Sequence, residues 1–186
     1  MPEATLEGRR VRLRPPGEED LPRLFEWVND PDLVAPYDRF SIDTWEGFQS
    51  GITAAPSDPH SLAPRFVVER KEGEPRLLGY VGYYDAHPVL AMTDLWYVLG
   101  ESSERGKGYG REAVGLLVDH VLHTIPRPRV GATCDVENLA SRHLLEGLGF
   151  RREGTLLSAL FHHARWHDVA VYGVTREEWA ARPRTE

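Results

Sequence analysis

The segment "ERGKGYGREA", residues 104–113, places three alternating glycines directly before an amphipathic run. Phosphate oxygens bind where successive backbone N–H groups converge and where a helix N-terminus adds its positive end. Side chains would block this approach, whereas Gly106, Gly108 and Gly110 leave it open and can adopt positive φ. Arg105 and Lys107 can neutralise the remaining charge. The segment therefore predicts a phosphate-binding loop at the start of a helix.

Three kinds of phosphate loop compete for this segment. A nucleotide triphosphatase loop needs a Ser or Thr after its lysine to hold magnesium, and here Gly108 follows Lys107. A dinucleotide fingerprint, G-x-G-x-x-G, belongs near the first strand, whereas this loop follows the fourth predicted strand with the spacing G-x-G-x-G. The third pattern, [QR]-x-x-G-x-[GA], is matched by Arg105, Gly108 and Gly110.

In this pattern the chain resembles the GNAT superfamily of N-acetyltransferases, and in particular its RimJ/RimL-like branch. The resemblance extends over four blocks in the right order, residues 6–34, 98–113, 137–156 and 165–179. "ENLASRHLLEGLGF" and "RWHDVAVYGVTREEW" are similar to the N-x-x-S…LGF and W-x-D…Y…EW segments of that branch. The resemblance implies an acetyl-CoA-dependent acyltransferase. It also implies a mixed α/β fold with a twisted, mostly antiparallel sheet that is splayed between its fourth and fifth strands.

The resemblance further implies where acetyl-CoA, the co-substrate, would bind. Its pantetheine would lie in the splay and hydrogen-bond to the backbone around Val98 and Leu99, and Asn138 matches the family asparagine near the cofactor. Asn138 is also a good helix N-cap, so it can serve both roles. The expected cofactor-binding residues are Val98, Leu99, Arg105, Gly106, Lys107, Gly108, Tyr109, Gly110, Arg111 and Asn138.

Acetyl transfer to an amine needs a base for the ammonium and a proton source for the departing thiolate. Many relatives supply that proton from a tyrosine whose position is Leu145 here. Ser141, one turn earlier, is the best substitute as a catalytic residue, although a helix serine also bonds the carbonyl one turn back. Asp94 matches the carboxylate that some relatives use as a base, and its alternative is an ion pair with an arginine. Asp85 and His87 are weaker candidates.

The acceptor pocket of the family lies between the first two helices and the fourth strand. Four aromatic residues can line it, although aromatics at such positions also form core: Tyr37, Trp45, Tyr84 and Tyr97. The leading acceptor is a protein or peptide N-terminus of the ribosomal-protein type. The alternatives are a small amine, such as a polyamine, aminoglycoside or amino acid, and a non-catalytic acyl-CoA-binding module. Relatives of this branch often form homodimers, which is a possible state of this chain too.

Hydrophobic periodicity predicts the elements that position these residues. The predicted strands are 9–16, 65–70, 76–86, 93–100, 129–136, 151–162 and 167–175, and helices are predicted at 18–30, 41–52, after the glycine loop, at 138–148 and at 176–182. The order β-α-α-β-β-β-α-β-α-β-β, followed by a short helix, indicates one α/β layered domain over residues 1–186.

The composition and net charge of the chain argue against several classes of partner. The 186 residues carry a formal net charge of -7 without a basic arm, which argues against nucleic acid. No apolar run approaches the roughly 20 residues that cross a bilayer, so no membrane partner is expected. Cys134 is the only cysteine, which indicates a reducing, cytoplasmic compartment. Adjacent histidines such as His162 and His163 point to opposite faces of a strand, and without a Cys or carboxylate cluster to complete a site with His167 no metal is expected.

Overall fold

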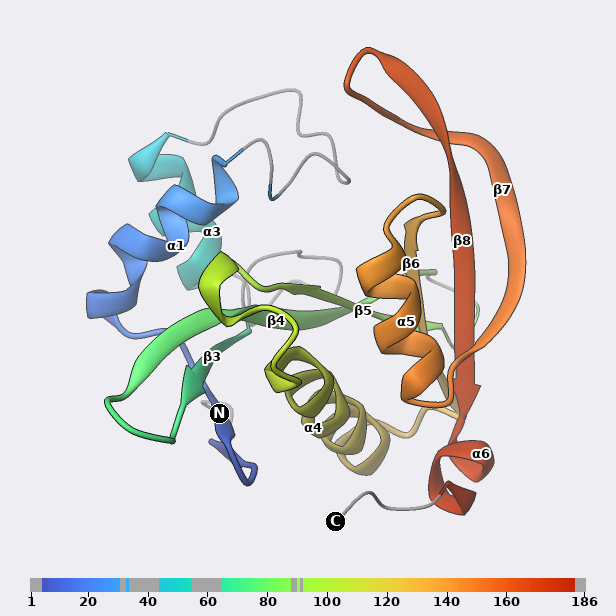
Figure 1. Cartoon of the computed structure of the whole chain (residues 1–186), viewed down its shortest axis with the longest axis horizontal. Coiled ribbons are helices and arrows are strands. Elements are labelled where there is room, and N and C mark those ends of the chain that lie inside the picture. The colour runs from blue at the N-terminus through green and yellow to red at the C-terminus, as the bar shows by residue number, and fades with distance from the viewer. Residues whose placement is uncertain are drawn as a thin grey trace.

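The computed structural model describes residues 5–30, 33, 44–54, 65–87, 90 and 92–182. Eight strands form one sheet in the order β1-β2-β3-β4-β5-β6-β8-β7 (Figure 1). The strands are β1 Leu6–Glu7, β2 Val11–Arg14, β3 Phe66–Arg70, β4 Arg76–Asp85, β5 Thr93–Val98, β6 Arg129–Asp135, β7 Arg151–His162 and β8 Arg165–Thr175. The helices are α1 Leu21–Val28, α3 Trp45–Ala54, α4 Tyr109–Thr124, α5 Leu139–Gly147 and α6 Arg176–Ala181. Every neighbouring pair of strands is antiparallel except β5 and β6.

The predicted order of elements and the mixed α/β fold class are confirmed, with one addition. The short strand β1 pairs with β2, so the predicted fourth and fifth strands are β5 and β6. Strand β8 begins at Arg165 rather than at His167, because His163 and Ala164 adopt φ of 48° and 60° in a two-residue turn between β7 and β8. Such left-handed pairs suit the tight turn of a hairpin.

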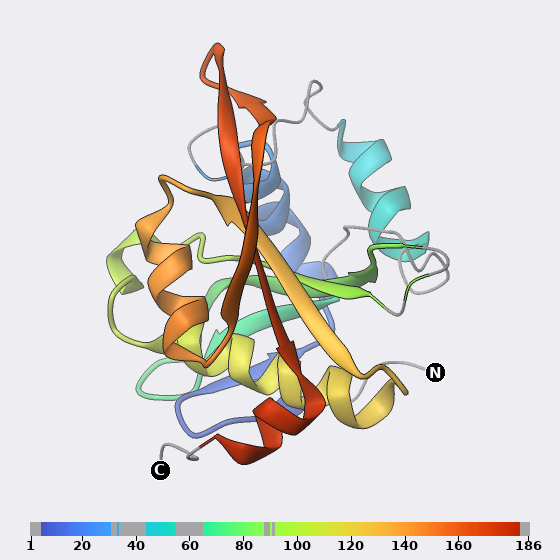
Figure 2. The ribbon, with the colours of Figure 1, turned by 90° about the vertical axis from the view of Figure 1, so that its right-hand side faces the viewer.

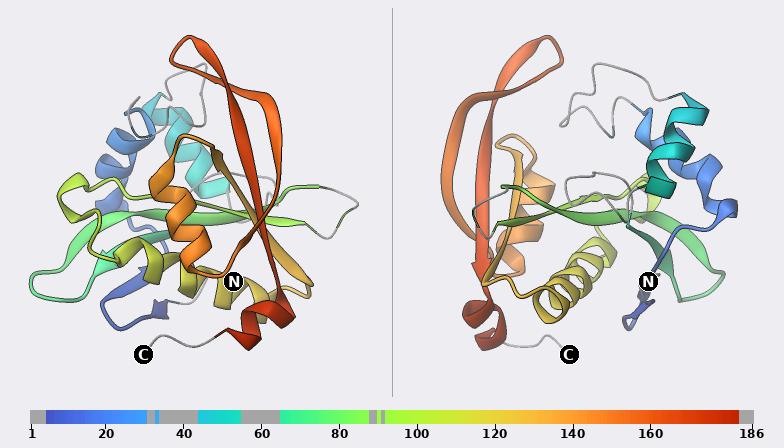
Figure 3. Two further views of the ribbon diagram at one scale, coloured as in Figure 1. Left: turned by 45° about the vertical axis from the view of Figure 1, so that its right-hand side comes forward. Right: turned by 180° about the vertical axis from the view of Figure 1, so that it is seen from behind.

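The helices cover the two faces of the sheet. One hydrophobic cluster joins α4 and α5 to inward-facing strand residues such as Leu95, Ala132 and Tyr172. A second cluster joins α1 and α3 to the opposite face through Tyr80, Trp96 and other residues. In Figures 1 and 3 the helices α1 and α3 accordingly lie on the other side of β3–β5 from α4. Since successive strand residues alternate between faces, each residue of β5 belongs either to the α4/α5 face or to the α1/α3 face. None of the described helices is long and apolar enough to cross a bilayer.

Strands β5 and β6 separate part-way along their length. They pair only from Thr93 to Leu95 on β5 and from Val130 to Ala132 on β6, although β5 continues to Val98 and β6 to Asp135. Figure 2 shows β6 running at a steep angle to β5. The predicted splay therefore lies at this point, with the ends of two strands and their backbone groups facing a gap.

Candidate functional site

The glycine loop leads directly into α4. Gly106 and Gly108 adopt φ of 76° and 88°, in the left-handed region that other residues rarely occupy, and Gly108 is the N-cap of α4. The first amides of a helix have no acceptor within the helix. Here those of Tyr109, Gly110 and Arg111 follow a left-handed turn, which is the geometry of a backbone anion nest.

A pocket opens between this loop, the end of β5 and the start of α5. It is lined by Leu33, Tyr97, Val98, Leu99, Arg105, Gly106, Gly108, Gly110, Arg111, Asn138, Ala140, Ser141 and Leu144. The structure thus brings together most residues that the sequence assigned to acetyl-CoA, although they come from three separate segments. A side chain at Gly110 would displace the Leu99 side chain in the pocket wall, since a Cβ there would lie 2.7 Å from Leu99 Cδ1.

Two arginines brace the pocket. The guanidinium of Arg105 donates from Nε and Nη2 to the carbonyl oxygen of Leu99, at 3.1 and 2.9 Å. Arg111 donates to the carbonyl oxygen of Gly147 at the end of α5. Both side chains therefore place positive charge at the pocket wall while they tie the loop to its neighbours.

Two other residues predicted to bind the cofactor do not line the pocket. The ammonium of Lys107 donates to Glu104 Oε2 at 3.0 Å, and the side chain of Tyr109 is buried with the guanidinium of Arg10 4.3 Å from its ring centroid. The loop residue Lys107 thus neutralises a carboxylate of its own turn, and Tyr109 contributes packing and a backbone amide.

A hydrogen-bonded group of side chains faces the pocket across the splay. Asn138 caps α5, accepting from the backbone N–H of Ser141 at 3.0 Å, so the N-cap expectation is confirmed. The hydroxyl oxygens of Ser141 and Tyr97 are 2.6 Å apart. Burial raises the pKa of the Cys134 thiol, and the nearby hydroxyl of Ser141 opposes this rise in part. Cys134 is only 7% exposed, which fits a small core residue rather than a nucleophile.

Leu145, at the position where relatives carry a tyrosine, is fully buried in the core beneath α4 and α5. It does not line the pocket. No proton donor for the cofactor sulfur can therefore come from this position.

Asp94 lies on the opposite face of the sheet from Tyr97. It pairs across β4 and β5 with Tyr84, and it is 8% exposed. Burial raises the pKa of Asp94, an effect that the charge of Arg129 opposes and that of Glu153 reinforces. Burial and the charge of Asp94 likewise raise the pKa of Tyr84. A carboxylate whose pKa is raised in this way is a better base than an exposed one.

The aromatic residues predicted for the acceptor do not form one group. Trp45 packs on Phe25, with ring centroids 5.3 Å apart, in the cluster that also contains Tyr84. Tyr97 instead faces the pocket on the α4/α5 face. Tyr37 lies outside the described residues.

The weaker base candidates have other partners. Asp85 is ion-paired with Arg127 at 2.9 Å and accepts from the hydroxyl of Thr93. His87 Nδ1 accepts from the backbone N–H of Leu90 at 3.0 Å.

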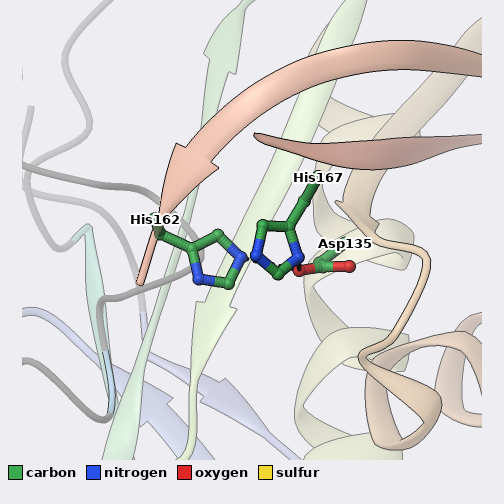
Figure 4. Close-up of side chains that lie close together, drawn as sticks. All are labelled: Asp135, His162 and His167. Carbon is green, nitrogen blue, oxygen red and sulfur yellow. Dashed lines mark hydrogen bonds and ion pairs between the residues drawn. The ribbon is translucent and has the colours of Figure 1, made fainter. Parts of the chain in front are cut away.

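The expectation that no carboxylate joins the histidines is wrong. Asp135 at the end of β6 lies beside His162 and His167, and all three are buried (Figure 4). The long-range pairing of β6 with β8 creates this cluster, so no local spacing in the sequence could have revealed it. His162 Nε2 is hydrogen-bonded to Asp135 Oδ2 at 2.7 Å, and His167 Nδ1 lies 2.8 Å from the same oxygen without the alignment of a hydrogen bond.

The ring geometry of this cluster is that of stacked imidazoles. The rings of His162 and His167 are 3.6 Å apart at an interplanar angle of 19°. A metal ion lies close to the plane of each imidazole that binds it, and no single point satisfies two nearly parallel planes at this separation. The absence of a metal site stays a prediction. Burial would raise the pKa of Asp135, but hydrogen bonds from the Glu137 backbone and His162, with the charges of both histidines, lower it overall.

The spacing of residues in α5 also predicts a pocket residue that the sequence analysis did not assign, Leu144. Asn138, Ser141 and Leu144 are spaced three apart, which places them on one side of the helix, and all three line the pocket. The contact between Ser141 and Tyr97 joins residues far apart in the chain, and no sequence pattern indicated it.

Comparison with known proteins gives a consistent result. The profile of the acetyltransferase (GNAT) domain matches residues 10–151. The chain is 26% identical over 166 residues to aminoglycoside N(6')-acetyltransferase type 1 of Klebsiella pneumoniae, covering 78% of this chain and 76% of that protein. It superimposes on ribosomal-protein-S5-alanine acetyltransferase of Vibrio fischeri with a TM-score of 0.75 at 20% identity, covering 97% and 100% of the two chains. For spermidine N-acetyltransferase of Vibrio cholerae, in complex with CoA and spermine, the TM-score is 0.76 at 18% identity, with 92% and 98% covered.

Proposed function

This chain belongs to the GNAT acetyltransferase family, and we propose that it moves the acetyl group of acetyl-CoA directly to the α-amino group of a peptide or protein. The observation that carries this proposal is the pocket in which the glycine loop, β5 and α5 meet. The family uses acetyl-CoA, so what remains to be tested is the site and the acceptor.

The pocket offers the groups that acetyl-CoA would need. The pyrophosphate would accept hydrogen bonds from the amides at the start of α4, which follow Gly108, with Arg105 and Arg111 neutralising its charge. The pantetheine would extend past Val98 and Leu99 into the splay. Because the carbonyl of Leu99 already accepts from Arg105, the other backbone groups at the end of β5 would hold the pantetheine amides. The thioester would thus lie near Tyr97 and Ser141.

Asp94 would act as the base that takes a proton from the acceptor amine. An ammonium cannot attack a carbonyl, so the acceptor must first give up a proton to a base. Asp94 is buried on the α1/α3 face, beside Tyr84. Its burial raises its pKa, which brings it closer to the pKa of an amine.

A peptide N-terminus fits a single carboxylate base better than an alkylamine does. The α-amino group has a pKa of about 8, whereas an alkylammonium such as lysine lies near ~10.4. The cost of forming the neutral amine near neutral pH is therefore smaller by about 3 kcal/mol, at about 1.4 kcal/mol for each pKa unit. The fold similarity to a ribosomal-protein-S5-alanine acetyltransferase agrees with this acceptor.

The second candidate acceptor is a small amine. Its support is the aminoglycoside N(6')-acetyltransferase that is 26% identical to the chain, together with the fold similarity to a spermidine acetyltransferase. A polyamine or aminoglycoside carries several positive charges, and the acidic chain, with a net charge of -7, would attract it.

The experiment is to follow release of the CoA thiol from acetyl-CoA with two acceptor pools run in parallel. One pool contains short peptides with varied free N-termini, and the other contains polyamines, aminoglycosides and amino acids. We expect turnover in the peptide pool alone. Turnover only with small amines would show that the acceptor is a small amine and would leave the proposed acetyl transfer unchanged. Acetyl-CoA binding without turnover in either pool would contradict the proposed catalytic activity and indicate an acyl-CoA-binding module.

We also propose that two chains pair through β7. This strand forms one edge of the sheet, and residues 151–159 are exposed along it. Leu156 and Leu157 are 53% and 77% exposed there, and an exposed apolar edge strand is a natural pairing surface. Sedimentation at micromolar concentration would give a dimer mass, whereas Leu157→Asp would give a monomer.

A further inference from the structure

Tyr97 and Ser141 join the two walls of the splay. Strand β5 pairs with β6 only as far as Leu95, and Tyr97 lies two residues beyond that point. Ser141 lies in the first turn of α5, which follows β6. Their hydroxyl oxygens are 2.6 Å apart, and both residues line the pocket. A phenol is thus held by a serine at the place where the proposed thioester would react.

The reaction needs an acid at this place. When the carbon–sulfur bond breaks, the sulfur leaves as a thiolate that must be protonated or released charged into the pocket. Leu145 cannot supply the proton, because it is apolar and fully buried. Cys134 is also unsuited, because burial raises the pKa of its thiol and it is hardly exposed.

We propose that Tyr97 donates the proton to the departing sulfur of coenzyme A and that Ser141 positions its hydroxyl. This inference rests on the proposed acetyl transfer and assigns Tyr97 a role in it different from lining the acceptor site. Tyrosine is the stronger acid of the pair, since a phenol ordinarily has a pKa near ~10 and an aliphatic hydroxyl is far less acidic.

The hydrogen-bond arrangement supports this division of roles. Either oxygen of the pair can be the donor. In the arrangement in which the Ser141 hydroxyl donates to the oxygen of Tyr97, the proton of Tyr97 is not used in this pair and can be given to the cofactor sulfur. The same hydrogen bond then stabilises the phenolate that forms when the proton is lost. Ser141 is itself held in the first turn of α5, because its backbone N–H donates to Asn138 Oδ1.

The proton balance closes without a further reagent. The neutral amine attacks the carbonyl carbon, and the tetrahedral intermediate collapses with cleavage of the carbon–sulfur bond. The sulfur takes the proton of Tyr97, while the nitrogen loses its extra proton to the base. Tyr97 regains a proton from solvent at the pocket mouth. When the acceptor enters as an ammonium, the sum is amide, free thiol and one released proton.

The test compares Tyr97→Phe and Ser141→Ala with the matched control Tyr83→Phe, which removes a hydroxyl from the neighbouring strand β4. Tyr83 packs against Arg65 and His120, outside the pocket. For Tyr97→Phe we expect kcat to fall by ~10²-fold, the usual scale of a lost general acid, with unchanged acetyl-CoA affinity by calorimetry. The wild-type rate should decline at high pH as Tyr97 loses its proton, and this decline should be absent from Tyr97→Phe. Ser141→Ala should lower kcat less, and Tyr83→Phe should match the wild type.

A second measurement separates proton donation from a purely structural hydrogen bond. Fluorotyrosine at position 97 keeps the shape and the hydroxyl but makes the phenol more acidic, so the high-pH decline should move to lower pH. An unmoved decline, or a Tyr97→Phe variant with wild-type kcat, would overturn the inference and leave the acetyltransferase intact. A wild-type chain that turns over no amine would instead overturn the proposed function, and this inference with it.

Discussion

Gly108 offers the sharpest test of the phosphate nest, because the chain contains a matched control for it. Gly108 has a φ of 88°, and a Cβ there would meet only Arg10 Nη1, at 3.7 Å. Gly73, in the turn between β3 and β4, has a φ of 71°, and a Cβ there would meet no neighbouring atom within 4 Å. Both glycines are exposed. Replacing either with alanine therefore imposes backbone strain and almost no steric clash.

The expected magnitude follows from the left-handed backbone. An L-residue in this region costs about 1–2 kcal/mol. If Gly108→Ala keeps the native loop, the cost lowers the stability of the free protein, by about 2–8 °C in Tm for a chain of this size. If the loop relaxes, the nest must be rebuilt on binding, and acetyl-CoA affinity falls by about 5- to 30-fold for the same 1–2 kcal/mol. The methyl group, which would lie near the phosphates, would add to the loss.

Calorimetric titration of acetyl-CoA and thermal unfolding of both variants measure the two contributions. Gly73→Ala should lose stability alone, and Gly108→Ala should lose affinity, with or without a loss of stability. Equal acetyl-CoA affinity in the two variants would refute the assignment of the nest, because Gly108 lines the pocket and Gly73 does not.

Two buried aspartates should respond to pH with opposite signs. Burial raises the pKa of Asp94 in the folded chain, so its stabilising contribution exists at low pH and is lost as pH rises through that value. Asp94→Asn should therefore lower kcat, remove the acidic limb of the rate profile and raise Tm at pH 7, and an unaltered rate profile would exclude Asp94 as the base. The pKa of Asp135 is lowered, so its contribution is present above the unfolded pKa of about 3.9 and lost as pH falls through the folded value. Asp135→Asn should lower stability at pH 7 by about 2 kcal/mol, the scale of hydrogen bonds to a charged group, and an undiminished Tm at pH 7 would contradict this.

The fold could be predicted from the sequence to the extent that its signals are local. Alternating apolar residues indicated the strands, and Gly149, with a φ of 90°, ends α5 as its position predicts. The start of β8 was missed because the turn at His163 and Ala164 uses left-handed residues without glycine. Turn propensities give no warning of such a pair.

The candidate site also has one part that local sequence predicts and another that depends on long-range strand pairing. The glycine loop and the cap at Asn138 depend on contiguous residues, and the structure has both at the start of helices. The cluster of Asp135 with two histidines and the contact of Tyr97 with Ser141 depend on how β6 and β8 pair and on where β5 and β6 part. Those distances are set by the register of the whole sheet, which no single segment encodes.

The alternation of side chains along β5 decides where the two proposed catalytic residues can act together. Asp94 and Tyr97 are three residues apart on β5, so their side chains emerge on opposite faces of the sheet. A base on the α1/α3 face and an acid on the α4/α5 face can act on one reacting carbon only where the sheet does not separate them. Asp94 itself lies in the paired stretch, opposite Gly131 of β6, but the pairing ends at Leu95, the next residue along β5, so the two substrates would have to meet just beyond Asp94. The splay would therefore admit the amine from one face and the thioester from the other, so that both substrates are bound together and the acetyl group passes directly between them without a covalent intermediate on the protein.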